Sequence, residues 1–143
     1  MGKRRIPKET DCFHYFNNNP KGKTNAGDCA VRAISAALAQ PWDTTLDELV
    51  QMSHKTKYSP FVTQNINKYL ESKGWVKCSQ PRKADDTKYT GREFCKNHLE
   101  CIKNDKIIIS IGCLHLSVII NSKVYDTWDC TDRCVGNYWV RKE

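Results

Sequence analysis

The sequence predicts an α+β domain whose N-terminal part is helical and whose C-terminal part forms an antiparallel β-sheet. Between residues 30 and 102 apolar side chains recur with the helical period, whereas residues 106–128 hold short runs of β-branched residues separated by turn-forming residues. The chain has 143 residues, which suits one domain, and neither a repeat nor a linker divides it. We therefore expect a single domain over residues 1–143, with residues 1–12 flexible.

The first two helices are expected from apolar spacing and helix-end signals. Apolar residues at i, i+3 and i+7 of an Ala-rich stretch predict a helix over residues 30–40, with Asp28 as its N-cap. The pattern Thr45-x-x-Glu48 has the form of a capping box and predicts the start of a second helix.

Two further helices are expected from similar signals. Pro60 can open a third helix, which Gly74 would end. Thr90-x-x-Glu93 is a second capping box, and it predicts a short amphipathic helix that continues through Leu99 and Ile102. The polar residues 79–92 before it are expected to be mostly loop.

Strands are expected where β-branched and aromatic residues gather in short runs. The C-terminal third holds the clearest runs, and two weaker ones lie earlier in the chain. The expected strands are residues 106–111, 115–120, 124–128 and 138–140, with a short strand at 75–78 and an extended aromatic segment around 13–16.

Composition excludes several classes of protein. With 39% hydrophobic and 27% charged residues, the chain is neither collagen-like nor wholly disordered. Its eight cysteines, about 6% of the residues, fall below the share that marks a secreted disulfide scaffold. The charged N-terminus lacks the apolar stretch of a signal peptide, and no segment approaches the roughly 20 apolar residues of a membrane span. We expect a cytoplasmic, reduced protein with no membrane partner.

The net charge allows several partners without selecting one. Lys and Arg number 23 and Asp and Glu 16, which leaves a net charge of +7. Such a charge permits contact with nucleic acid or with acidic proteins. The basic residues are dispersed, however, and no nucleic-acid-binding motif is present, so the sequence does not indicate a nucleic-acid partner.

Three residues that are distant in sequence together suggest nucleophilic catalysis. Cys29 lies in the first turn of the first expected helix, where the positive end of the helix dipole favours a thiolate. A catalytic thiol also needs a base and, usually, a group that orients the base. His115 begins one expected strand, and Asp126 lies 11 positions later in the next strand.

The turn between those two strands decides whether His115 and Asp126 can meet. With a two-residue turn at Asn121-Ser122, the numbers of paired residues sum to 243. Asp126 is then the diagonal neighbour of His115 on the same face, about 7–8 Å away, which two side chains can bridge. A three-residue turn would place them on opposite faces, and the sequence alone leaves both turns open.

Plainer roles for these side chains also remain open. A single cysteine in an Ala-rich helix is commonly a core residue, and a histidine at the start of a strand is commonly a surface residue. Trp42 and Trp128 can line a substrate groove, although packing in the core is the commoner role.

A second cluster, Cys95-x-x-His98-x-x-Cys101, places three potential zinc ligands along one helix. Its spacing spans two helical turns and differs from the C-x₂₋₄-C loops that usually hold zinc. We therefore expect neither a metal nor another cofactor. A disulfide between Cys130 and Cys134 is expected only outside the cytosol or as a redox event.

Two short motifs resemble those of the papain-like cysteine peptidase superfamily. They are Gly27-Asp28-Cys29-Ala30-Val31-Arg32-Ala33-Ile34 and His115-Leu116-Ser117-Val118-Ile119-Ile120, the latter followed by Val124-Tyr125-Asp126-Thr127-Trp128. The most similar branches are the bacteriocin-processing peptidases and small phage and bacterial proteins related to them. The resemblance covers about residues 13–140 in element order. It implies a papain-like fold in which Cys29 is the nucleophile, His115 the base and Asp126 the orienting group.

The resemblance also implies an oxyanion hole made by the backbone N–H of Cys29 and a side-chain amide shortly upstream. The family usually has Gln six positions before the cysteine, where this chain has Lys23. Asn25 is the first choice for the missing amide, ahead of Asn18 and Asn19. Asparagines in a polar loop are otherwise turn formers.

The expected function is that of a thiol hydrolase or peptidase that cleaves a peptide, amide or isopeptide bond of a peptide or protein substrate. The alternative is a non-catalytic phage-type protein on the same fold that binds and inhibits a host or defence factor, including a nucleic-acid-associated one. An enzyme should place the sulfur of Cys29 within about 4 Å of a ring nitrogen of His115, beneath a cleft.

Overall fold

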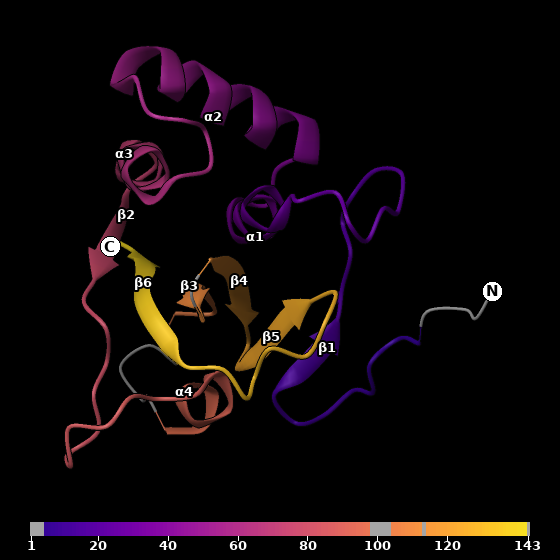
Figure 1. Cartoon of the computed structure of the whole chain (residues 1–143), viewed down its shortest axis with the longest axis vertical. Coiled ribbons are helices and arrows are strands. Elements are labelled where there is room, and N and C mark those ends of the chain that lie inside the picture. Colours follow the sequence, from indigo (N-terminus) through magenta and orange to yellow (C-terminus); the bar gives the residue numbers. More distant parts are fainter. Residues whose placement is uncertain (1–4, 98–103, 113, 143) are drawn as a thin grey trace.

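The computed structural model describes residues 5–97, 104–112 and 114–142, and it contains four helices and six strands in those ranges. The strands form one sheet, with α1, α2 and α3 on one side of it and α4 on the other (Figure 1). Helices α1 and α3 contact the sheet, and α2 packs on both of them. The expected combination of helices and a sheet in this chain is thus confirmed.

The helices are α1 (Cys29–Leu38), α2 (Trp42–Thr56), α3 (Thr63–Ser72) and α4 (Gly91–Asn97). The strands are β1 (Phe13–Tyr15), β2 (Trp75–Cys78), β3 (Lys106–Ile111), β4 (His115–Ile120), β5 (Lys123–Asp126) and β6 (Val135–Arg141). Every expected element therefore occurs within the described ranges, although several begin or end at other residues. Leu99 and Ile102, expected in the fourth helix, lie outside these ranges.

The sheet is mixed, so the expectation of a purely antiparallel, C-terminal sheet is wrong. Its strand order is β1-β5-β4-β3-β6-β2, and β1 pairs with β5 in parallel while the other neighbours are antiparallel. A parallel pair needs a long crossover connection, and here the whole helical part of the chain lies between Tyr15 and Lys123. The two edge strands thus come from earlier in the sequence than the four central ones.

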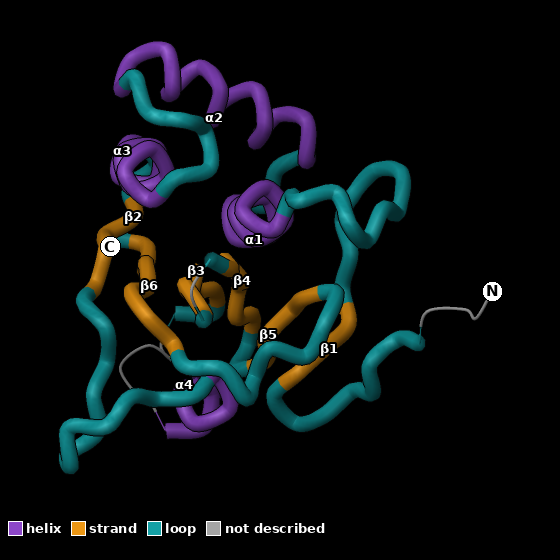
Figure 2. The backbone as a smooth tube through the Cα atoms, in the orientation of Figure 1, coloured by secondary structure: helices purple, strands orange, loops and turns teal. Residues whose placement is uncertain are grey.

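Two apolar cores lie on the two faces of the sheet. Figure 2 shows the sheet between α1, α2 and α3 above and α4 below. One core contains Ile34 and Leu70 from the helices and Ile108 from β3. The other contains Phe94 from α4 and Ile109 from β3. Because successive residues of a strand point to opposite faces, a central strand covered on both sides needs a continuous apolar run, as β3 has.

Helix α2 begins three residues before Thr45, so the prediction that Thr45 and Glu48 form a capping box at its start is wrong. Thr45 is buried inside the helix, where its Oγ1 accepts hydrogen bonds from Ser35 Oγ (2.8 Å) and Gln40 Nε2 (2.8 Å). Glu48 accepts a hydrogen bond from Tyr69 (2.6 Å). The side chains of Thr45 and Glu48, which a capping box would use, are instead hydrogen-bonded to residues of other segments.

The capping box of α4 is confirmed by both of its hydrogen bonds. The backbone N–H of Glu93 donates to Thr90 Oγ1 (3.2 Å), and the backbone N–H of Thr90 donates to Glu93 Oε1 (3.0 Å). Helix α3, in contrast, starts at Thr63 rather than at Pro60, with Val62 as its N-cap. None of the described helices has the length and apolarity required to cross a bilayer.

The described end of the segment expected to be flexible, residues 5–12, contacts the neighbouring strands. The Glu9 carboxylate is hydrogen-bonded to His14 (2.7 Å) and to Lys123 (2.7 Å), and Cys12 is fully buried. The backbone N–H of Val124 donates to the Cys12 carbonyl (2.8 Å), which extends the pairing of β1 and β5 by one residue.

Candidate active site

Cys29 is the first residue of α1 and is half-buried. Asp28 occupies the N-cap position, as expected, but its side chain does not cap the helix. Its carboxylate instead accepts hydrogen bonds from Asn19, Arg32 and Trp42, each at 2.9 Å. The backbone N–H groups that open α1 beside the Cys29 thiol therefore have no hydrogen-bond partner among the described residues.

The turn between β4 and β5 has two residues, which confirms the register on which the sequence argument depends. Asn121 and Ser122 have φ angles of 49° and 68°, as a type I′ turn requires. Ile120 opposes Lys123, so paired residue numbers sum to 243 as expected. His115 at the start of β4 and Asp126 at the end of β5 consequently meet at one end of the sheet, with His115 Nε2 at 2.6 Å from Asp126 Oδ2.

Both oxygens of the buried Asp126 carboxylate have hydrogen-bond partners. Its side chain is 1% exposed. Oδ2 binds His115 and accepts a hydrogen bond from Ser117 (2.6 Å), while Oδ1 accepts from Arg32 (3.0 Å). Burial raises the pKa of Asp126, but the contacts with His115 and Ser117 and the charge of Arg32 outweigh burial and hold the pKa below its ordinary value. Asp126 is therefore ionised.

The Cys29 thiol interacts with the same imidazole, whose Nε2 binds Asp126. A catalytic thiol would use the remaining nitrogen, Nδ1. Burial raises the pKa of Cys29, but hydrogen bonds with His115 and with the Leu116 backbone lower it below the ordinary value for a thiol. Burial likewise lowers the pKa of His115, whereas its bond to Asp126 and its contacts with thiols raise it to about 11. Together these shifts favour a thiolate–imidazolium pair.

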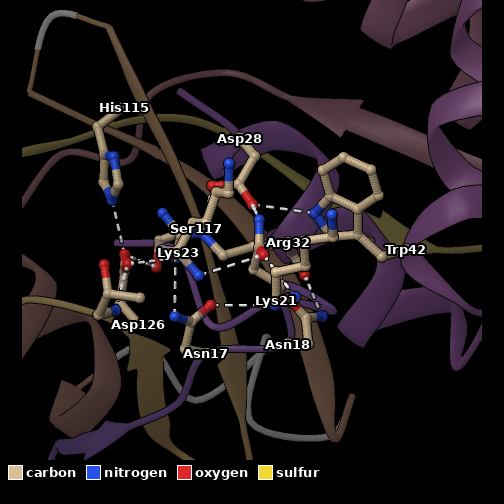
Figure 3. Close-up of polar contacts among 12 residues, drawn as sticks. Asn17, Asn18, Lys21, Lys23, Asp28, Arg32, Trp42, His115, Ser117 and Asp126 are labelled. Carbon is tan, nitrogen blue, oxygen red and sulfur yellow. Dashed lines mark hydrogen bonds and ion pairs between the residues drawn. The ribbon is translucent and has the colours of Figure 1, made fainter. Parts of the chain in front are cut away.

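Arg32 connects the start of α1 to the end of β5. Its guanidinium binds Asp28 through Nε (2.9 Å) and Asp126 through an Nη (3.0 Å), and its side chain is 11% exposed. Figure 3 shows Arg32 between the two carboxylates, with His115 directed toward Asp126 and Ser117 beside it. A planar guanidinium can bind two carboxylates in a fixed geometry, so Arg32 holds the thiol-bearing helix in register with Asp126.

A cleft with a volume of about 410 Å³ lies over Cys29 and His115. Phe61, Val62 and Leu114 line it and are exposed large apolar side chains, with Leu114 96% exposed. Among the described residues, no Asp, Glu, Lys or Arg lines this cleft. A ligand would therefore meet apolar and neutral polar walls next to the thiol.

The two tryptophans considered as groove residues pack beside the site instead of lining the cleft. Trp42 donates its indole N–H to Asp28 (2.9 Å), and the ring of Trp128 lies 4.9 Å from that of His115. Neither is among the residues that line the cleft. Both stabilise the groups around the thiol, which agrees with the plainer role considered for them.

Asn25 is exposed and does not line the cleft, so the structure does not bring it together with Cys29 and His115. Its role in an oxyanion hole stays a prediction. Asn18 donates to the Arg32 carbonyl (3.1 Å), and Asn19 donates to Asp28, so both hold the loop against α1.

Sequence reasoning missed the amide side chains that do line the cleft. These are Gln64 on α3 and Asn137 on β6, and neither has a hydrogen-bond partner among the described residues. Gln64 lies 35 positions after Cys29, and Asn137 lies 22 positions after His115, so no local motif connects either residue to the site.

The remaining described cysteines have no disulfide. Burial raises the pKa of Cys130 and that of Cys95, the latter to about 12, so both are protonated thiols. Cys134 is exposed and Cys130 fully buried, and the bridge considered between them is absent. His98 and Cys101 of the second cluster lie outside the described residues.

No family model matches the chain, and no curated protein and no solved structure matches it either. Cys29 and His115 line the cleft, and the buried Asp126 binds His115.

Proposed function

We propose that this chain is a papain-like thiol hydrolase that cleaves a peptide, amide or isopeptide bond. One observation carries the proposal: Cys29 and the buried Asp126 both interact with His115, and Cys29 and His115 line an open cleft. A thiol, an imidazole and an orienting carboxylate in this order form the arrangement that acyl transfer by a cysteine requires. The position of the thiol at the start of a helix that packs on the strand bearing the base supports the papain-like fold.

In the first half of the reaction, the Cys29 thiolate attacks the carbonyl carbon of the bound substrate. The developing oxyanion accepts a hydrogen bond from the unpaired backbone N–H of Cys29 at the start of α1. The protonated His115 then donates its Nδ1 proton to the leaving amine, while Asp126 keeps the ring oriented through Nε2. This step breaks the C–N bond and leaves a thioester on Cys29.

In the second half, water attacks the thioester. The now neutral His115 accepts a proton from this water, the C–S bond breaks, and the thiolate–imidazolium pair is restored. Gln64 and Asn137 supply amide groups that can bind the carbonyl oxygens or N–H groups of an extended substrate in the cleft. The absence of charged side chains from the described lining favours a substrate that is uncharged around the scissile bond.

Site-resolved alkylation tests the activated nucleophile without knowledge of the substrate. The reduced protein would be treated with iodoacetamide at pH 6.5, and the labelling rate of each cysteine would be measured by mass spectrometry. Cys29 should react fastest although it is half-buried, because only a thiolate reacts at this pH. Cys134 is exposed and serves as the matched internal control.

In the His115→Ala variant the labelling rate of Cys29 should fall to that of Cys134 or below. Equal rates for the two cysteines in the native chain would contradict the proposal. The non-catalytic binding protein is the rival: a Cys29→Ala variant that keeps its fold and its full biological activity would favour that alternative.

A further inference from the structure

Cys130 is a buried thiol that the proposed hydrolysis does not use. Its side chain is fully buried, and its Sγ lies 3.7 Å from Asp126 Oδ2. Its Sγ also lies within 4.8 Å of a ring nitrogen of His115. A second thiol therefore contacts the same His115–Asp126 pair that activates Cys29.

The three side chains form a compact group of metal-binding atoms. One donor atom each from His115, Asp126 and Cys130 lies within 4.8 Å of the other two. In a tetrahedral zinc site with bonds of about 2.0 Å to nitrogen or oxygen and about 2.3 Å to sulfur, ligand atoms are about 3.3–3.6 Å apart. The S–O separation of 3.7 Å already has this size, whereas the N–O separation of 2.6 Å must open by about 0.7 Å.

Charge and ligand type favour a soft divalent cation over Mg²⁺ or Ca²⁺. One thiolate, one carboxylate and one neutral imidazole offset the two positive charges, and nitrogen and sulfur ligands favour Zn²⁺. The charge of Arg32 beside Asp126 is already balanced by Asp28. His115, whose side chain is 16% exposed, lines the cleft, so one member of the group is in contact with solvent.

We propose that His115 Nε2, Asp126 Oδ2 and Cys130 Sγ form an inhibitory site for Zn²⁺. Binding forms one Zn–N, one Zn–O and one Zn–S bond, and it releases two protons to solvent, one from Nε2 and one from the thiol. No atom changes its oxidation state, and water takes the remaining coordination position. The metal ion thus replaces the proton between His115 and Asp126.

Occupation of this site would stop the proposed hydrolysis. With the ion on Nε2 and a proton on Nδ1, His115 has no free ring lone pair with which to accept a proton from the Cys29 thiol or from water. The inhibition therefore rests on the proposed function, whereas metal binding itself does not. Cys29 is not a ligand in this arrangement, because the group of donor atoms contains only His115, Asp126 and Cys130.

Binding can be measured with Zn²⁺ alone on the full, reduced chain, by competition against a chromophoric chelator. Cys130→Ser should weaken the tightest site by more than about 100-fold, since even the loss of an outer-sphere partner typically costs 10–100-fold. Cys29→Ser and the control Cys134→Ser should keep that affinity. Zinc should also slow the alkylation of Cys29 in the native chain and leave it unchanged in Cys130→Ser.

Equal zinc affinity in the native chain and in Cys130→Ser would overturn the proposal. So would a loss of affinity in Cys29→Ser alone, which would assign the metal to the catalytic thiol. X-ray absorption of the native zinc complex tests the site without any substitution, which matters if Cys130→Ser fails to fold. One sulfur neighbour at about 2.3 Å with nitrogen and oxygen neighbours is expected, and two or more sulfur neighbours would refute the assignment. Tight zinc binding without fast alkylation of Cys29 would keep the metal site and reject the hydrolase.

Discussion

In the Cys29→Ala variant, the free energy of unfolding should decrease as the pH rises from about 6.5 to about 8.5. In the native chain, Cys29 and His115 together should contribute no pH dependence in the same range. His115 faces Asp126 from β5, Cys29 from α1, and Cys130 from the segment after β5, with Arg32 behind Asp126. Its raised pKa contributes stability that is fully present below the unfolded value of about 6.5 and is lost as the pH rises toward 11. The lowered pKa of Cys29 acts in the opposite direction, because its contribution grows with pH up to the unfolded value of about 8.5.

A folded thiolate–imidazolium pair makes these two contributions cancel in the native chain between about pH 6.5 and 8.5. Such a pair holds one proton, on His115, and the unfolded chain also holds one, on Cys29, so folding neither takes up nor releases a proton. Without the thiol, folded His115 still keeps its proton through its bond to Asp126, while the unfolded histidine loses it. The free energy of unfolding should then fall by up to about 1.4 kcal/mol per pH unit, or about 2 kcal/mol over this range.

Urea unfolding followed by tryptophan fluorescence at several pH values between 6.5 and 8.5 measures this difference. Other groups titrate equally in the native chain and in Cys29→Ala. The quantity to follow is therefore the difference between their free energies of unfolding, and how this difference changes with pH. Cys78→Ala is the matched control, since this half-buried thiol lies on edge strand β2, and it should behave as the native chain does. Parallel curves for the native chain and Cys29→Ala would refute the thiolate–imidazolium pair.

Three further substitutions test other parts of the structure. Arg32→Met leaves two buried carboxylates without their cation and should lower the free energy of unfolding by about 3–5 kcal/mol; a loss below 1 kcal/mol in urea titrations would contradict the bridging role. Thr90→Ala removes the α4 capping box and should cost about 1 kcal/mol in thermal unfolding, whereas Thr44→Ala on the exposed face of α2 should change stability by less than about 0.5 kcal/mol. One glycine inserted between Asn121 and Ser122 turns the following strand over, so the α1 thiol should lose its fast alkylation; an unchanged rate would count against the triad.

The contact between His115 and Asp126 could be predicted only for a two-residue turn, because it depends on the local geometry of the hairpin. A two-residue turn at Asn121-Ser122 fixes the strand register, and the register fixes which side chains share a face. The α4 capping box could be predicted for the same reason, since both partners lie within one helical turn of Thr90.

Where the sequence reasoning failed, a tertiary contact replaced the expected local one. Asp28 was expected to cap α1, but Trp42 and Asn19 reach its carboxylate from other segments. Arg32 belongs to the motif that suggested the family resemblance, yet its partner Asp126 lies 94 positions further along the chain. No periodicity or spacing in a single sequence encodes such a pairing.

The parallel pairing of β1 with β5 affects when the site forms during folding. Phe13 and Val124 are about 110 positions apart, and the Phe16 N–H donates to the Asp126 carbonyl (2.8 Å). Contacts of such sequence separation close late in folding, because the entropy of the long loop must be lost first. A chain that is still being synthesised therefore carries an ordinary thiol at position 29, and Cys29 becomes reactive only when the two ends of the chain have met. The alkylation rate of Cys29 during refolding should therefore rise when β1 pairs with β5.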